Sequence, residues 1–349
     1  MSDERLTRPK ASNDDARLLH AAARERLSVA AADLELPQNL RLSEWQRSTV
    51  AGILAKLVRT IEDELRTSLA ETEAVRGHEA LHAALSAAHV PIAGPILDRS
   101  GAHIERQLVA ALVRRAEEHR RFRTRGASES GLLLELIRDS DEAVAEQAMA
   151  IVIAQSRRFD RFSEPVAART ELPAELEHRL VWRVAAALRL YMVDRHGLAP
   201  VAADEAVVAA AERLLAAYDE GDSLDARSLR LARRLNESGR LTDEAIARAL
   251  AEGSLPLFLA GLAVRAGLSL SSAWEIVSDP RGRGAVLILK AAGIGRGHAA
   301  AILVALGSEE SVEAQVDQFD VTDSESAREA LRLWQVNPGY REAMAEIAQ

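Results

Sequence analysis

The stretch GRLTDEAIARALAEGSLPLFLAGLAVRAG, residues 239–267, holds two short apolar segments with a glycine before, between and after them. Ala, Leu, Arg and Glu make up most of both segments and are strong helix formers. Glycine is favoured just beyond the end of a helix because it enters the left-handed backbone conformation without steric cost. The stretch therefore predicts two short helices joined by a tight glycine turn.

Glycines continue to punctuate the C-terminal half of the chain at this spacing. Their intervals are 14, 14, 15, 13 and 12 residues, and each interval has room for one short helix. Short helices joined by tight turns pack as antiparallel pairs, and stacked pairs form a solenoid. One pair per roughly 28 residues is shorter than the about 40–47 residues of HEAT and armadillo units. We therefore predict an all-α, HEAT-like α-solenoid punctuated by Gly239, Gly253, Gly267, Gly282, Gly295 and Gly307.

The composition of the 349-residue chain supports this fold class and excludes several kinds of chemistry. Hydrophobic residues make up 48% of the chain and aromatic residues only 3%, so the apolar content is mostly aliphatic. The absence of cysteine excludes thiol catalysis, disulfides and thiolate metal sites. A net charge of −9 disfavours broad attachment to nucleic acid or acidic lipid.

Several sequence patterns that indicate membrane insertion, secretion or cofactor binding are absent. The N-terminal residues have no apolar signal-peptide core, and no segment approaches the about 18 apolar residues of a membrane-spanning helix. Phosphate-loop, nucleophile-elbow and dinucleotide-binding motifs do not occur in the sequence. We therefore expect a cytoplasmic protein that binds no membrane and no cofactor.

Helix signals fill the N-terminal half of the chain as well. Ser43 and Gln46 have the spacing of a capping box, and the helix that follows is expected to reach about Ala70. Pro173 opens a long helix to about His196. The apolar stripe of the first of these helices comprises Val50, Ile53, Leu54, Leu57, Ile61 and Leu65. Further helices are expected over 15–32, 73–88, 103–123, 128–138 and 141–156.

Changes in composition suggest four parts of the chain. Residues 1–14 are polar and form a flexible N-terminus, and 15–196 form an N-terminal helical region. Gly197 and Pro200 mark the boundary to the helical repeats of 197–307. The last part is 308–349. Its first twenty residues, 308–327, contain seven acidic residues and no Lys or Arg. Thr322 and Glu325 have capping-box spacing and predict terminal helices after the acidic segment.

Several segments have a distinctive pattern of helices and turns, namely RTELPAELEHRLVWRVAAALRLYM (169–192), LARRLNESGRLTDEAIARALAEGSLPLFLAGLAVRAGLSLSSAWEIVSD (231–279) and LKAAGI (289–294). They resemble a bacterial family of unknown function that is known mainly from alphaproteobacteria. The similarity continues through LVRTIEDELRTSLAE (57–71) and VPIAGPILDRSG (90–101). The resemblance implies an all-helical protein with HEAT-like repeats, and it carries no reaction, ligand or catalytic residue.

One segment, HEALH at 78–82, has the pattern of a zinc hydrolase. On a helix, His78 and His82 would share a face and could hold zinc, while Glu79 would act as the base. A third protein ligand is needed, and His89 and Glu105 are the candidates. The alternative interpretation is a solvated helix face that binds no metal.

The hairpin AAGIGRGHAAAIL, residues 291–303, resembles a helix-hairpin-helix motif that grips a phosphate. Exposed backbone N–H groups at the start of a helix attract anions, and the surrounding segment is basic. The alternative interpretation is a structural repeat turn like the other glycine turns. The candidate phosphate-binding residues are Arg281, Arg283, Lys290, Gly295, Arg296 and Gly297.

Two arginine clusters are candidate docking surfaces. RRAEEHRRFRTRG, residues 114–126, has six Arg against two Glu. Arg227, Arg230 and Arg234 are spaced to share one helical face, and Arg binds carboxylates and phosphates with paired hydrogen bonds. Solvated faces and internal ion pairs are the alternative interpretation of both clusters.

Taken together, these patterns favour a non-enzymatic helical-repeat scaffold with a regulatory role. Stacked helices expose a continuous surface, and arginine clusters separated from an acidic segment suit a charged protein partner, which the sequence does not identify. The alternative is nucleic-acid or nucleotide-phosphate binding through 281–298, and a more remote alternative is the zinc hydrolase.

Overall fold

The computed structural model describes residues 42–87, 90–101, 104–124, 131–158, 165–279, 281–307 and 311–347. The regular elements among these residues are α-helices and short 3-10 helices, which confirms the all-α fold class. The predicted flexible N-terminus and the helix expected over 15–32 lie outside the described residues. The chain divides after Arg47, and Ser48–Gln349 forms one compact unit.

The helix α2, Glu44–Ala70, begins at the predicted capping box. The backbone N–H of Gln46 donates to Ser43 Oγ at 3.2 Å, and the N–H of Ser43 donates to Gln46 Oε1 at 2.9 Å. The predicted apolar stripe of this helix is buried along its whole length. Local capping and helical periodicity therefore set both the start and the buried face of α2.

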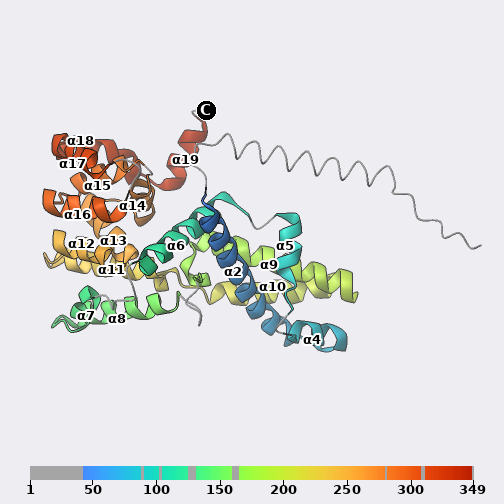
Figure 1. The fold of residues 1–349 in the computed structure, drawn as a ribbon. Coiled ribbons are helices and arrows are strands. Elements are labelled where there is room, and N and C mark those ends of the chain that lie inside the picture. Colours follow the sequence, from blue (N-terminus) through green and yellow to red (C-terminus); the bar gives the residue numbers. More distant parts are fainter. Residues whose placement is uncertain are drawn as a thin grey trace, which may run out of the picture. The chain divides into compact units, whose positions relative to one another are not determined.

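A first core forms around α2 from helices in two separate parts of the sequence, 44–124 and 174–216. Pro173 stands directly before α9, and Gly197 ends it in the left-handed conformation with φ 66°. Helix α10 then folds back onto α9, and the two lie side by side in Figure 1. The predicted boundary at Gly197 therefore falls between two helices of one core. The first core comprises α2, α3 (Glu73–Arg76), α4 (Glu79–Ser86), α5 (Ala93–Ser100), α6 (Arg106–Thr124), α9 (Ala174–His196) and α10 (Pro200–Ala216).

A buried ion pair on α2 binds the end of α4 and the start of α5. Glu62 Oε1 and Oε2 accept hydrogen bonds from the N–H groups of Ile92 and Ala93 at 2.7 and 2.9 Å, where α5 begins. Arg66, one turn later, donates to the carbonyl of Leu85 at 2.8 Å, near the end of α4. The two side chains lie 3.2 Å apart and are almost fully buried. Both helix ends are therefore satisfied by α2 rather than by water.

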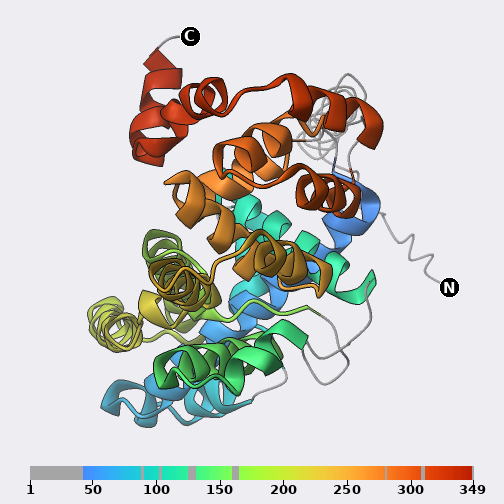
Figure 2. The same ribbon diagram turned by 90° about the vertical axis from the view of Figure 1, so that its left-hand side faces the viewer.

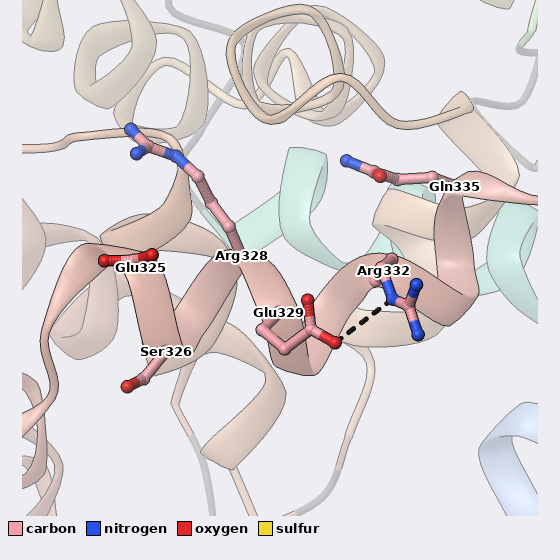
Figure 3. A pocket seen from close by; sticks show the side chains of 6 residues that line it. All are labelled: Glu325, Ser326, Arg328, Glu329, Arg332 and Gln335. Atoms are coloured by element: carbon pink, nitrogen blue, oxygen red, sulfur yellow. Dashed lines mark ion pairs between the residues drawn. The ribbon is translucent and has the colours of Figure 1, made fainter.

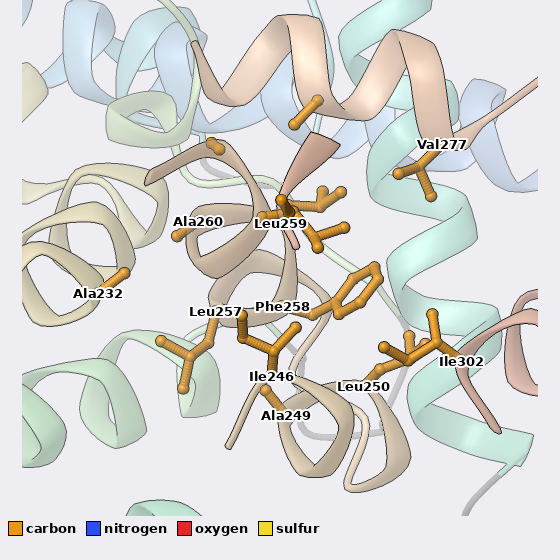
Figure 4. Close-up of a cluster of buried hydrophobic side chains, with 14 of the residues drawn as sticks. Ala232, Ile246, Ala249, Leu250, Leu257, Phe258, Leu259, Ala260, Val277 and Ile302 are labelled. Atoms are coloured by element: carbon orange, nitrogen blue, oxygen red, sulfur yellow. The ribbon is translucent and has the colours of Figure 1, made fainter. Parts of the chain in front are cut away.

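A second core contains α7, α8 and the helices from α11 to α18. It includes most of the segment punctuated by the six glycines from Gly239 to Gly307, the glycine array. Phe258 on α13 is fully buried near its centre and lies among Ile246, Leu250 and Ile302 (Figure 4). The second core comprises α7 (Gly131–Ile137), α8 (Glu142–Ser156), α11 (Leu224–Glu237), α12 (Asp243–Ala251), α13 (Leu255–Ala266), α14 (Leu270–Val277), α15 (Arg283–Ala291), α16 (Arg296–Leu306), α17 (Val312–Val321) and α18 (Ser324–Leu331).

The helices of the second core, apart from α14, pack in two rows. One row runs through α8, α11, α13, α15 and α18, and the other through α7, α12, α16 and α17. In Figure 2 the colours pass from green at α7 and α8 through orange to red at α17 and α18 along these rows. Helices of the two rows contact each other as pairs, for example α7 with α8 and α12 with α13. This arrangement is compatible with the predicted stack of antiparallel pairs.

The glycine array differs from its prediction at two of six positions. Gly239, Gly253, Gly267 and Gly307 follow helices with positive φ, as expected. Helix α14 ends at Val277, five residues before Gly282. Gly282 instead stands directly before α15, with a positive φ of 75°. In the hairpin, Gly293 has the positive φ of 68°, whereas Gly295 is extended with φ −66° and precedes α16.

Two local predictions were wrong, one about the length of a helix and one about the residue that caps a helix. The helix expected over 73–88 is two helices, because the chain turns at Gly77 and His78 between α3 and α4. Helix α18 is capped by Asp323 rather than by Thr322. The Asp323 carboxylate accepts hydrogen bonds from the N–H groups of Glu325 and Ser326, while the Thr322 hydroxyl turns back to the Gln318 carbonyl.

Candidate protein-interaction surface

The three arginines predicted to share a docking face on α11 bind to the chain itself. Arg227 donates to Asp222 Oδ1 at 2.8 Å, and Arg230 donates to the carbonyl of Gly221 at 2.8 Å. Both partners belong to the short 3-10 helix η3, Glu220–Asp222, which leads into α11. Arg234 donates to Asp141 Oδ2 at 2.8 Å, at the start of α8. These contacts favour the internal ion pairs, and the docking role stays a prediction.

The arginine cluster at 114–126 enters a buried charge network that links the two cores. Arg114 on α6 donates two hydrogen bonds of 2.7 Å to the carboxylate of Asp225 on α11. Arg158 makes ion pairs with Glu118 and with Glu171 of the 3-10 helix η2, Arg169–Glu171. Arg120, by contrast, pairs with Glu117 on the surface of α6. Residues 125–126 of the predicted cluster lie outside the described residues.

Electrostatics explain why this buried network holds its charges. Burial alone would raise the pKa of the Glu118 carboxyl, but Arg158, Arg114 and Arg115 surround it and lower the pKa overall. Asp225 and Glu118 raise the pKa of Arg114 against the effect of its burial. Sequence reasoning missed the network because Arg114 and Asp225 are 111 residues apart. The network joins α6 to α11 through Arg114 and to η2 through Arg158.

The candidate phosphate site at the start of α16 is filled by a carboxylate of the chain. The N–H of Gly295 donates to Asp243 Oδ2 at 2.7 Å, and Arg265 pairs with the same carboxylate. Arg265 also donates to the carbonyl of Gly293 at 3.0 Å. Asp243 thus occupies the place where an anion would meet the first N–H groups of a helix. The hairpin backbone is therefore bound by Asp243 and Arg265 of the same chain.

The basic side chains around the hairpin separate into two groups. Arg296 pairs with Asp320 at 2.9 Å, and Lys290 donates to the carbonyl of Phe319 at 2.8 Å. The Lys290 ammonium also lies 4.2 Å from the centre of the Phe319 ring. Arg281 and Arg283 are exposed at the opposite end of α15. Gly297 is exposed within α16, and phosphate binding by these residues stays a prediction.

The HEALH segment lies at the broken turn between α3 and α4. His78 precedes α4, Glu79 is its first residue, and His82 lies one turn into it. Glu105 pairs with Arg179 and Arg183 at 2.6 and 2.7 Å. His89 lies outside the described residues. Among the residues that are described, no three His, Asp or Glu side chains gather in a metal-binding group.

A surface depression of about 600 Å³ lies over α18 and the 3-10 helix η4, Arg332–Gln335. Figure 3 shows Arg328 and Arg332 pointing in different directions, with an ion pair between Glu329 and Arg332. That ion pair is 3.1 Å long and both side chains are exposed. The depression is lined by Glu325, Ser326, Arg328, Glu329, Arg332 and Gln335. Its charges therefore face solvent rather than a common ligand position.

The last helix, α19 (Pro338–Ile347), carries exposed apolar side chains at helical spacing. Tyr340, Met344 and Ile347 are 60%, 43% and 87% exposed, and they share one face of the helix. Leu333 and Val336, just before the helix, are also exposed. Single exposed apolar residues are ordinary, whereas several on one helix face make that face a candidate interaction surface. The i, i+4, i+7 pattern was present in the sequence, and sequence analysis missed it because the segment was interpreted from its charge.

Arg341 attaches α19 to the second core. Its guanidinium pairs with Glu275 of α14 and lies 5.6 Å from the centre of the Trp334 ring. The Ser272 hydroxyl of α14 donates to the carbonyl of Trp334 at 2.9 Å. These contacts hold α19 by its polar side, so its apolar row stays exposed.

Membrane-spanning potential is limited to one bent helix pair within the described chain. No single helix there has both the length and the apolar character that crossing a bilayer requires. Helices α13 and α14 pass such a test together, with a bend of 105° between them. Nearly all of α13 is buried in the second core, as expected for a central helix of a folded domain.

Comparison with known proteins assigns the chain to a family. A family model described as "Uncharacterised protein conserved in bacteria (DUF2336)" matches residues 127–333. The chain belongs to the DUF2336 family. The match confirms the bacterial family of unknown function, while its alphaproteobacterial range and HEAT-like repeats stay predictions. No curated protein and no solved structure matches the chain. The DUF2336 region runs from α7 to η4, and α19 follows it.

Proposed function

We propose that this DUF2336 protein is a non-enzymatic helical scaffold that binds another protein in a regulatory role. The observation that carries the proposal is the apolar row on α19, which is exposed in the part of the chain that the structure describes. The C-terminal segment is attached to α14 of the second core through Arg341 and through the carbonyl of Trp334. The cytoplasmic location expected from the cysteine-free sequence is part of this proposal.

The pairing of the charged groups supports binding rather than catalysis. The predicted arginines of α11 and the hairpin amide of Gly295 have partners within the chain. Glu105, a candidate zinc ligand, is held by Arg179 and Arg183. An active site instead needs polar groups that are free to meet a substrate. The exposed apolar side chains of α19 are instead available to contact a partner.

The proposal is tested by in-cell cross-linking of the tagged full-length chain in its own bacterium. The captured material is divided for protein mass spectrometry, absorbance before and after nuclease, and zinc analysis. We expect one or a few proteins in amounts comparable to the tagged chain, unchanged by nuclease. Recovery of nucleic acid alone would favour the basic residues Arg281 and Arg283. One equivalent of zinc without a protein partner would favour His78 and His82.

A further inference from the structure

We propose that the C-terminal apolar row, Leu333, Val336, Tyr340, Met344 and Ile347, binds a basic amphipathic helix of a partner protein. This inference rests on the proposed scaffold function and names the surface and the chemistry of the partner. Two properties carry it, namely the geometry of the exposed row and the net charge of residues 308–349.

The geometry of the row suits a helical partner. Tyr340, Met344 and Ile347 follow i, i+4, i+7 spacing, which places their side chains along about 10 Å of one helix face. Helix-in-groove and helix-pair contacts use anchors at this spacing. Leu333 and Val336 extend the apolar surface at the start of the helix. A partner helix with its own apolar stripe would cover the row with few rearrangements.

The net charge of the C-terminal segment indicates the charge of that partner helix. Residues 308–349 contain ten Asp and Glu against three Arg and no Lys, so they carry −7 of the net charge of −9. Glu313, Asp317, Glu325 and Glu329 are exposed on α17 and α18. Complementary potential steers association and rejects partners of like charge. The partner helix therefore has Lys or Arg beside its apolar stripe.

The same charge argues against three other occupants. Nucleic acid and an anionic membrane would both be repelled by the acidic segment. A second copy of this chain would bring two segments of charge −7 together, which opposes dimer formation through α19. A cationic partner is instead attracted by the negative charge of this segment.

The attachment of α19 makes the row available without refolding. Arg341 holds the helix through Glu275 and Trp334, and the Asn337 side chain caps its start by accepting from the N–H of Gly339 at 2.8 Å. A helix that is already formed and attached loses less conformational entropy on binding. The row is therefore arranged for binding before a partner arrives.

The test measures binding of a defined peptide to the full-length chain by fluorescence anisotropy. The probe is an acetylated helical peptide of Leu and Lys with Leu in an a/d heptad pattern. The comparison peptides are a scrambled Leu and Lys sequence and a Leu and Glu heptad peptide. We expect the Leu–Lys heptad peptide to bind at least tenfold more tightly than either comparison peptide, and raised salt to weaken this binding.

Two matched variants locate the binding surface. Met344→Glu, at 43% exposure on α19, is expected to weaken binding of the probe at least tenfold. Val208→Glu, at 40% exposure on α10, is expected to leave binding within twofold of the native chain. Both positions are on the surface, and far-ultraviolet circular dichroism checks that both variants are folded.

Other outcomes would overturn the inference. Equal binding of the scrambled peptide, or equal loss in both variants, would show that attraction is not specific to the row. Concentration-dependent dimers in sedimentation that disappear in Met344→Glu would identify a second copy as the occupant. If cross-linking in cells recovers a partner that Met344→Glu still binds, the scaffold function stands and this surface is wrong. If no protein is recovered from cells, the scaffold function itself fails.

Discussion

Glu62 and Arg66 show how two residues organise the short helices of the first core. Each is buried, and each meets backbone groups at helix ends that would otherwise lack partners. A buried charge is tolerated only when it is paired and hydrogen-bonded, so each residue depends on the other. Both lie in LVRTIEDELRTSLAE, one of the segments that carry the family resemblance. A structural role is therefore sufficient to explain their chemistry.

The replacement Glu62→Gln tests this role at the residue scale. It leaves Arg66 buried without its counter-charge and weakens the capping of α5, so the free energy of unfolding should fall by about 3 kcal/mol. Urea denaturation followed by circular dichroism at pH 7 measures the change. The control is Asp204→Asn, which breaks an exposed ion pair with Arg189 and should hardly move the urea midpoint. Equal shifts in the two variants would contradict the assigned role of Glu62.

At the scale of elements, the hairpin between α15 and α16 is a local motif whose backbone N–H group binds a residue distant in the sequence. Its turn and its second helix were recognisable from the glycines in the sequence. Its partner, Asp243, lies 52 residues earlier, at the start of α12. The carboxylate ties the starts of α12 and α16 together, as the contact between these helices in one row requires.

The ionisation of Asp243 predicts a pH dependence for this link. Burial alone would raise the pKa of its carboxyl, but the Gly295 N–H, Arg265 and His298 together hold it below the usual value of 3.8. A lowered pKa in the folded state contributes stability above the unfolded value, and that stability is lost as the pH falls through the folded pKa. Asp243→Asn should therefore cost about 1 kcal/mol at pH 5 and progressively less below pH 3.8.

Urea denaturation of the native chain and of Asp243→Asn at pH 5 and pH 3 measures this difference. A difference between the two proteins that is the same at both pH values would contradict the ionic contribution of Asp243.

At the scale of the whole chain, the order of the cores does not follow the order of the sequence. Helices α7 and α8 pack in the second core, whereas α9 and α10, which come later, pack in the first. The chain therefore passes from the first core to the second core and back before it enters the glycine array. The buried network of Arg114, Glu118, Arg158, Glu171 and Asp225 lies where these crossings meet.

Removing one carboxylate from the network should loosen the joint between the cores. Asp225→Asn deprives buried Arg114 of its paired acceptor on α11, so the N–H groups at the start of α11 and along α6 should exchange hydrogen at least tenfold faster. The interior of α13, which is packed in apolar contacts, should keep its protection. Hydrogen exchange with mass spectrometry resolves these segments. Uniform acceleration in all helices would instead indicate global destabilisation without a separate joint.

Helix positions in this protein were largely predictable from local sequence. The capping box of α2, the proline and glycine that bound α9 and four of the six array glycines act within a few residues of their own position. The partners of the charged residues were not predictable, because Arg114 meets Asp225 and Gly295 meets Asp243 across long separations in the chain. Exposure of the α19 row was likewise set by packing, since an apolar stripe has the same pattern whether a neighbouring helix covers it or not. Local hydrogen bonding and periodicity decide where a helix begins and which face is apolar, whereas tertiary packing decides which charges are neutralised and which apolar face remains for a partner.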